Sequence, residues 1–277
     1  MRGEQFGWGP AGLTVLATTA ALALLGPSGL SACASRTEAP HFALTSARIL
    51  QPKHTEFPAT LALAAGPHTR SLDSYAGIRI DGVAVFDADA APLSRGETRS
   101  GVSIASILAP IPVGTEPFEF DEIVVMWDDR TETTHPVGQW RFEPTQEHTE
   151  ADAVNDWPAA IGDCESLTVP LPSTADGAAQ GTVHVDQPGV HLGARSGIFS
   201  APSGGTDLVL DLRCSDRFDF SVVTASHSAQ PAEPAAPGEP PAAAPGAAEH
   251  PFDPILVGYL DVSDADVARI LGRAGNS

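Results

Sequence analysis

The chain has 277 residues, a formal net charge of -20 and only 15 basic residues against 35 acidic ones. Such acidity repels nucleic-acid phosphates and anionic lipid headgroups, which excludes nucleic acid as a partner. The length allows one large or two small domains.

An uncharged apolar run opens the chain. Leu13–Leu25 follows Arg2 and precedes the helix-breaking Gly26-Pro27-Ser28-Gly29. A positive start, an apolar segment and small residues before a cut are typical of a signal peptide, and the run is shorter than the about 20 residues that span a bilayer. We expect residues 1–32 to be a signal peptide; an uncleaved anchor and plain secretion are the alternatives.

Leu30-Ser31-Ala32-Cys33 closes this leader. A small-residue stretch that ends in cysteine after an apolar segment resembles the lipobox of bacterial lipoproteins. The resemblance implies that the Cys33 sulfur carries a diacylglyceryl group and that Cys33 becomes the first residue. Residues 33–40 would then tether the protein to the extracytoplasmic face of the cell membrane. The motif predicts a cellular location and does not predict an activity.

Strand patterns dominate residues 41–145, the expected first β block. Ile123, Val125 and Trp127 alternate onto one face, and Asp128-Asp129-Arg130 supplies a turn to a polar return strand, which Pro136 and Gly138 are expected to end. Gln139–Phe142 follows as a separate strand. The other expected strands are His41–Leu50, Ala59–Ala65, Ile78–Phe86 and Val102–Leu108.

A second β block is expected from residues 160–226 plus 255–262, after a polar stretch at 144–160. Its strands are Ser166–Leu171, Thr182–Val185, Asp207–Arg213, Phe218–Val223 and Ile255–Val262.

The two remaining cysteines lie in this second block, Cys164 before its first strand and Cys214 after its third. With Cys33 assigned to lipid, they form an even pair in an oxidising compartment, so we expect a Cys164–Cys214 disulfide. A metal-thiolate pair is the alternative, but no CxxC spacing supports it.

The C-terminal part changes composition twice. Residues 227–250 are rich in Pro and Ala and are expected to form a disordered, solvated insertion. Ile255–Val262 then resembles a returning strand. Residues 263–272 are expected to form a short helix that Ser263-Asp264 caps and Gly272 ends.

No catalytic motif stands out in this sequence. Ser200 lacks the glycines of a nucleophile elbow, so we expect a non-enzyme. Candidate metal ligands are present, but their spacing fits no site: the histidines His41, His54, His68, His184 and His191, and the acids Asp261, Asp264 and Asp266. We expect no metal site and no cofactor.

Residues 116–156 carry twelve acidic side chains and two arginines. They form either an acidic face for a cationic partner or calcium, or a solvated sheet edge that resists edge-to-edge pairing; the second is favoured.

Together these observations predict an all-β body of immunoglobulin-like sandwich architecture, as one or two sandwiches, with a short C-terminal helix. The predicted function is a lipid-anchored cell-envelope protein that binds a protein or small ligand without catalysis. The alternative is an envelope hydrolase or metal-binding protein whose site is assembled from dispersed residues.

Overall fold

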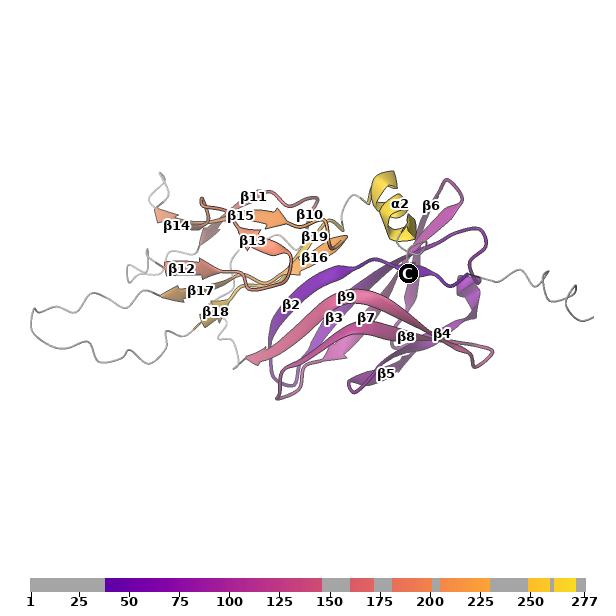
Figure 1. Cartoon of the computed structure of the whole chain (residues 1–277). Helices are drawn as coiled ribbons and strands as arrows, with labels where there is room; N and C mark the ends of the chain where they lie inside the picture. The colour runs from indigo at the N-terminus through magenta and orange to yellow at the C-terminus, as the bar shows by residue number, and fades with distance from the viewer. Residues whose placement is uncertain are drawn as a thin grey trace, which may run out of the picture. The chain divides into compact units, whose positions relative to one another are not determined.

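The computed structural model describes residues 38–145, 160–171, 181–200, 205–229, 249–259 and 262–272. Cys33 and the leader lie outside these residues, as does residue range 230–248 of the expected insertion. The described residues are mostly β-strand and include one α-helix, α2 (Asp264–Gly272) (Figure 1). At nine residues, α2 is too short to cross a membrane, and within the described ranges no other helix could do so.

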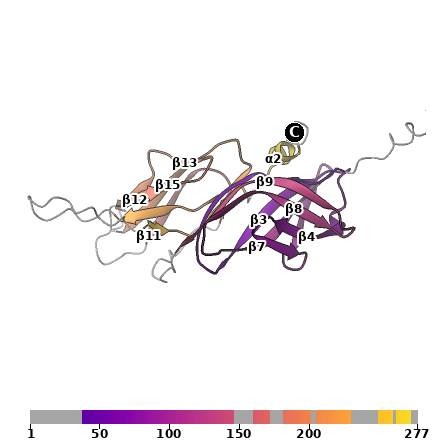
Figure 2. The ribbon, with the colours of Figure 1, turned by 60° about the horizontal axis from the view of Figure 1, so that its bottom comes forward.

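Two sheets form a first sandwich. One sheet has the order β1-β3-β7-β6 and the other includes the order β2-β9-β8-β4-β5. Figure 1 labels β2 to β9 of this set, and Figure 2 shows β3, β4, β7, β8 and β9 from a second side. Their bounds are β1 (His41–Phe42), β2 (Thr45–Pro52), β3 (Glu56–Ala65), β4 (Tyr75–Ile80), β5 (Ala84–Asp87), β6 (Leu93–Arg99), β7 (Val102–Pro112), β8 (Phe118–Trp127) and β9 (Glu132–Thr145).

This strand order is immunoglobulin-like. Three strands, β3, β7 and β6, pair in one sheet, while β9, β8, β4 and β5 pair in the other, as in the variable-type arrangement of that fold. The first segment contributes to both sheets: β1 pairs with β3, and β2 pairs in parallel with β9. The expected single strand His41–Leu50 is therefore wrong, because the chain switches sheets at Ala43–Leu44.

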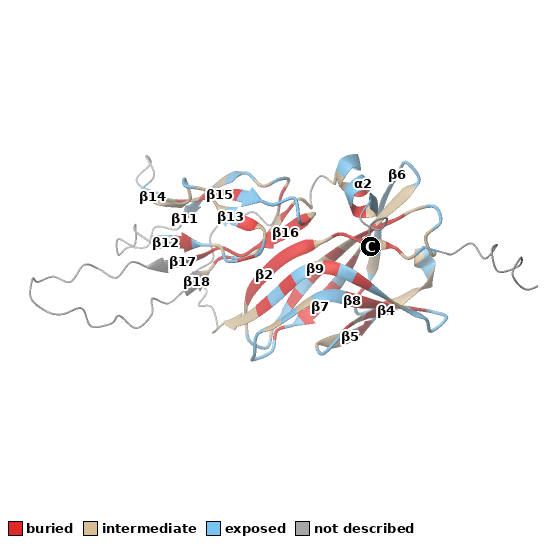
Figure 3. Cartoon of the chain, viewed as in Figure 1, coloured by how far each residue is buried: buried red, intermediate tan, exposed pale blue. Residues whose placement is uncertain are grey.

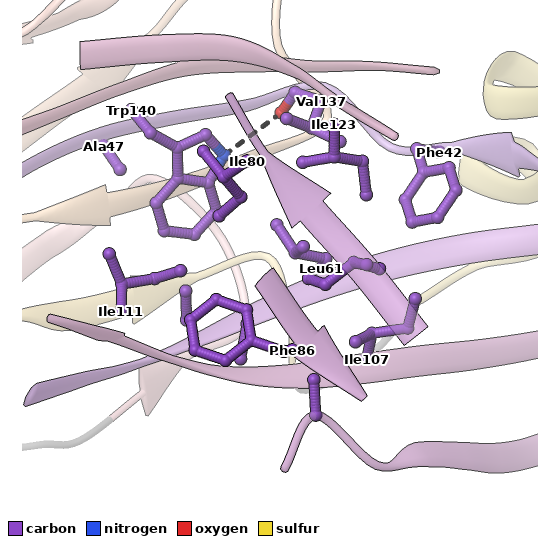
Figure 4. Packing of buried hydrophobic residues seen from close by; sticks show 14 of the residues in the cluster. Phe42, Ala47, Leu61, Ile80, Phe86, Ile107, Ile111, Ile123, Val137 and Trp140 are labelled. Carbon is purple, nitrogen blue, oxygen red and sulfur yellow. Dashed lines mark hydrogen bonds between the residues drawn. The ribbon is translucent and has the colours of Figure 1, made fainter. Parts of the chain in front are cut away.

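The core of the first sandwich lies between its two sheets (Figure 4). Trp140 is fully buried, and its indole Nε1 donates to the Val137 carbonyl oxygen at 3.2 Å. Ile123, Val125 and Trp127 are all buried, which confirms the face predicted from their alternation. The red and blue bands along β9 in Figure 3 show the same period of two, with buried and exposed residues in turn.

A second sandwich repeats this plan with shorter strands. In one sheet, β15 pairs with β11 on one side and with β13 and β14 on the other. Opposite it, β12 pairs with β17, and the first strand β10 pairs in parallel with the last strand β19. The bounds are β10 (Ala160–Ile161), β11 (Ser166–Leu171), β12 (Gly181–His184), β13 (Val190–Leu192), β14 (Gly197–Ser200), β15 (Thr206–Cys214), β16 (Phe220–Val223), β17 (Ser226–Ala229), β18 (Glu249–Pro251) and β19 (Ile255–Val257).

The sheets of the two sandwiches are continuous through one parallel pairing. β16 lies between β19 and β2, with Phe220 opposite Thr45 and Val222 opposite Ala47. The hydroxyl of the half-buried Tyr259 lies 3.1 Å from Thr45 Oγ1 and donates to the Thr60 carbonyl oxygen at 3.2 Å. Burial raises the pKa of Tyr259 well above its usual value, so the phenol stays protonated as a donor.

Helix α2 packs against the first sandwich. Its buried residue Ile270 clusters with Ala43, Ala64 and Phe220. The cap is a reciprocal pair: Ser263 Oγ accepts from the Asp266 amide at 3.2 Å, while Asp266 Oδ2 accepts from the Ser263 amide at 2.9 Å. The predicted short helix is confirmed, with Asp266 rather than Asp264 completing the cap.

Two further sequence expectations are wrong in instructive ways. Ile78–Phe86 is not one strand, because Val83 donates to the Ile80 carbonyl oxygen at 3.0 Å and closes a β4–β5 hairpin. Pro136 and Gly138 do not end a strand, because β9 continues through both. Gly138 has φ of 96° and lies against the Thr45 backbone, where a β-carbon would not fit; this glycine permits the β2–β9 pairing.

Two smaller differences concern the acidic stretch and the Pro/Ala-rich segment. β8 and β9 lie inside their sheet, so the acidic stretch is not a sheet edge as expected; Glu119, Asp121 and Glu122 are instead exposed on β8. β17 and β18 extend a few residues into the range 227–250 from either side.

Candidate functional site

A polar cleft lies at the end of the second sandwich where the disulfide, the turn between β15 and β16, and α2 meet. Its volume is about 960 Å³. Six carboxylates and two guanidinium groups line it: Asp163, Glu165, Asp211, Asp216, Asp219 and Asp266, with Arg213 and Arg269. We refer to it as the acidic cleft.

The predicted disulfide forms one wall of the acidic cleft. Cys164 and Cys214 are bonded, with their Cα atoms 5.8 Å apart, inside the ordinary range for a disulfide. Cys164 precedes β11 and Cys214 ends β15, and these strands are antiparallel neighbours with Ser166 opposite Asp211. The bond therefore joins two strand ends within one sheet, and it brings the acids that flank each cysteine together.

One carboxylate of the cleft has a structural role. The Asp219 side chain is fully buried and accepts from the Leu44 amide and from Arg269 Nε, each at 2.8 Å. Arg269 also pairs with Asp266, so these charges fix α2 to the segment before β2. Burial of Asp219 is tolerated because a guanidinium and an amide both satisfy it.

Three other carboxylates face solvent at the mouth of the cleft. Asp163, Glu165 and Asp216 are exposed, and Asp163 Oδ1 accepts from the Cys164 amide at 2.8 Å. Asp211 is buried below them, and its Oδ2 lies 3.7 Å from Arg213. Carboxylates that converge in a recess focus a negative potential, which attracts cationic groups.

The histidines that are candidate metal ligands are dispersed over the fold. His41 lies in β1, His54 and His68 are exposed in loops, and His184 and His191 belong to different sheets. Asp261 lies outside the described residues, while Asp266 caps α2. Across the ranges given above, no three His, Cys, Asp or Glu side chains are grouped as metal ligands. Ser200 ends β14.

Sequence reasoning missed the acidic cleft as a site, although its signal was present. Asp163 and Glu165 flank Cys164, and Asp216 follows Cys214 by two residues. Once the disulfide is predicted, these acids must converge. The acids of residues 116–156 give a stronger sequence signal because they are close together in the chain.

No protein-family model matches the chain, and no curated protein matches it. Among solved structures it is similar to SGBP-B of a Bacteroides ovatus mixed-linkage glucan utilization locus, in complex with a mixed-linkage heptasaccharide, at 13% identity and a TM-score of 0.24. That match covers 76% of this chain and 42% of the other, so the chain spans less than half the length of that protein.

A second similar structure is the N-terminal Ig1-2 module of the Drosophila receptor protein tyrosine phosphatase DLAR, at 10% identity and a TM-score of 0.23, covering 79% of this chain and 98% of that one. A tandem of titin Ig domains matches at 8% identity and a TM-score of 0.21, covering 79% and 97%. Such low identities and TM-scores transfer no ligand or activity to this chain.

Proposed function

We propose that the chain is a lipid-anchored cell-envelope protein that binds a cationic partner in the acidic cleft without catalysis. The lipobox Leu30–Cys33 supports the anchor. The proposal that the cleft binds a cationic partner rests on its charge, because six carboxylates and only two guanidinium groups line it. A basic segment of another envelope protein has the matching charge.

The short tether supports a location close to the bilayer. Glu38, the first described residue, is five Cα-to-Cα steps from Cys33. At about 3.5 Å for each extended residue, they reach at most roughly 17 Å. A folded body held this close meets partners in or beside the membrane at a high effective concentration.

The anchor is tested by acyl-chain labelling in a bacterial host. We expect the wild-type chain to incorporate a labelled fatty acid and to sediment with membranes. Cys33→Ala should lose the label and accumulate as the longer precursor. Labelling or processing that survives Cys33→Ala would remove the anchor from the proposal.

Binding is tested with a fluorescent oligo-lysine peptide, by anisotropy, at low and at physiological salt. The triple variant Asp163→Lys, Glu165→Lys, Asp216→Lys reverses the exposed charge of the cleft. A matched control, Glu119→Lys, Asp121→Lys, Glu122→Lys, makes the same change in net charge on β8.

We expect the cleft variant to weaken peptide binding at least tenfold and the β8 control to weaken it less than threefold. Each replaced charge within reach of the peptide removes on the order of 0.5–1 kcal/mol, whereas distant charges are screened. Equal losses in the two variants would show that net charge alone attracts the peptide and that the cleft is not the site.

A further inference from the structure

A small cleft lies at the end of the first sandwich where β1 pairs with β3, with His41 opposite Ala64. Its volume is about 200 Å³. The cleft is lined by residues of the segment Ala65–Leu72, which ends β3 and continues beyond it, by Arg95 of β6 and by Ser103 of β7. Pockets for whole small molecules measure roughly 300–1,000 Å³, so this cleft fits a single charged group. We refer to it as the arginine cleft.

The lining of the arginine cleft suits an anion. Arg70 and Arg95 supply two guanidinium groups, and Thr69, Ser71 and Ser103 supply hydroxyl groups. No carboxylate is among the described residues of this lining. Guanidinium groups donate from a planar fork that matches the oxygens of a phosphate. The acidic cleft has the opposite composition, so the two clefts favour ligands of opposite charge.

Two groups of this lining have unused hydrogen-bonding capacity. Thr69 Oγ1 is buried and has no hydrogen-bond partner among the described residues. Arg95 donates to Asp73 through Nη2 alone, and its Nε and Nη1 have no partner in the part of the chain that the structure describes. Asp73 is not in the lining of the cleft. A buried hydroxyl without a partner lowers stability, and an anion that accepts from it restores the missing bond.

Arg70 is held in place before any ligand arrives. Its Nε donates to Ser74 Oγ at 3.2 Å, and its Nη1 donates to Thr131 Oγ1 at 2.6 Å. Its guanidinium carbon lies 4.6 Å from the centre of the Trp127 ring, and its Nη2 lies 2.6 Å from Asp129 Oδ2. Asp129 also lies outside the lining. Each Nη carries a second hydrogen, so Arg70 can donate to a ligand without changing its position.

The chain that leads from Cys33 enters the first sandwich beside this cleft. β1 begins at His41, and its pairing with Ala64 places this entry next to Ala65 of the lining. The lipid anchor proposed above holds this end of the sandwich near the bilayer, whose surface presents phosphate groups. Salt screens the distant acids of the chain, so donors in direct contact with a phosphate outweigh their repulsion.

We propose that the arginine cleft binds a phosphate group through Arg70, Arg95 and the Thr69 hydroxyl. The group belongs to a phospholipid headgroup of the anchoring membrane or to free phosphate, which share this chemistry. The site is separate from the acidic cleft, and only the lipid source rests on the proposed anchor.

Free phosphate is tested by calorimetry with the full chain, purified in dodecyl maltoside and phosphate-free buffer. We expect saturable binding and about a tenfold loss of affinity in Arg95→Gln, because charge-assisted hydrogen bonds are lost. Thr69→Val should weaken binding about threefold without lowering the thermal midpoint, because an unmet buried hydroxyl does not stabilise the fold. Arg141→Gln on β9 is the matched control and should bind phosphate like the wild type, since the Arg141 side chain is equally exposed, at 53%, and pairs with Glu143.

The lipid source is tested by hydrogen exchange of residues 65–72 in the full chain. Transfer from dodecyl maltoside to phosphatidylglycerol vesicles should slow exchange of this segment in the wild type and not in Arg95→Gln. Protection by free phosphate alone would support the site and assign it to free phosphate. No phosphate binding together with no Arg95-dependent protection, or an equal loss in Arg141→Gln, would overturn the site. The calorimetric result does not depend on Cys33, so the site and the anchor can fail separately.

Discussion

The two sandwiches share one plan but are stabilised differently. Counted over the described residues, the buried cluster of the first has 23 members, with Trp127 and Trp140 among them, whereas that of the second has 11, of which one, Phe252, is aromatic. The longest strand of the first, β9, has 14 residues, and the longest of the second, β15, has 9. The second sandwich is also the one that carries the disulfide.

This difference follows from how little apolar surface short strands can bury. The free energy gained by burying a small core exceeds the conformational-entropy cost of folding by little. A covalent link between residues far apart in sequence adds to this small net stability. The Cys164–Cys214 link closes a sequence separation of 50 residues. We therefore expect packing changes to destabilise the first sandwich most and redox changes to destabilise the second most.

Trp140→Ala should have the largest effect, about 5 kcal/mol of unfolding free energy, because a fully buried tryptophan leaves a large cavity in a dense core. Urea unfolding measures the loss, and hydrogen exchange locates it in residues 41–145. Trp140→Phe, which keeps an aromatic ring against Phe120, should lose less than half as much. Equal loss of protection in the second sandwich would show that the two unfold as one unit.

Cys164→Ser with Cys214→Ser should cost about 4 kcal/mol, as the chain-entropy model gives for a loop of this length. Exchange protection should fall in β11 and β15 while it persists in β8 and β9. Reduction of the wild-type protein is the matched control and should reproduce the effect. A thiol titration that finds both cysteines free in the unfolded, unreduced protein would remove the basis for this difference.

The next effect depends on pH and belongs to the first sandwich. His135 is buried, and burial, with a smaller contribution from the His41 charge, lowers its pKa from 6.5 to about 4. His135 Nε2 lies 2.8 Å from Thr133 Oγ1, which also accepts from Trp127 Nε1 at 2.9 Å. The neutral His135 ring thus shares a hydrogen bond with the Thr133 hydroxyl, and the tautomer of the ring sets which of the two groups donates.

A lowered folded-state pKa for histidine means that protons bind the unfolded chain more tightly. The stability that neutral His135 provides is thus complete above pH 6.5 and is lost as pH falls from 6.5 to about 4, by about 3 kcal/mol in all. Urea unfolding at several pH values measures this slope. His135→Gln should flatten it, and His68→Gln, at an exposed loop position, should leave it unchanged.

How much of this could be predicted from sequence depends on whether the signal is local. The face of Ile123, Val125 and Trp127 follows from alternation over five residues, and the Ser263 cap from the pattern at one helix end. The β4–β5 hairpin was missed because Asp81-Gly82 sits within an apolar run that resembles one strand. β9 was cut short because a proline and a glycine usually end strands, and only the pairing with β2 shows why Gly138 is accommodated.

The candidate sites depend on contacts that no local pattern contains. The acids that flank Cys164 and the acid that follows Cys214 are brought together by the disulfide and by the β11–β15 pairing.

The smallest effect concerns the helix that links the two regions. α2 follows β19 of the second sandwich but packs against Ala43 and Ala64 of the first. Ser263→Ala should cost about 1 kcal/mol by removing the cap, while Ser263→Asp should retain most of it. Hydrogen exchange of residues 264–272, measured with and without the disulfide, then decides which region holds the helix. We expect its protection to follow the first sandwich, because two of the three buried residues that cluster with Ile270, Ala43 and Ala64, belong to it, whereas Phe220 belongs to β16.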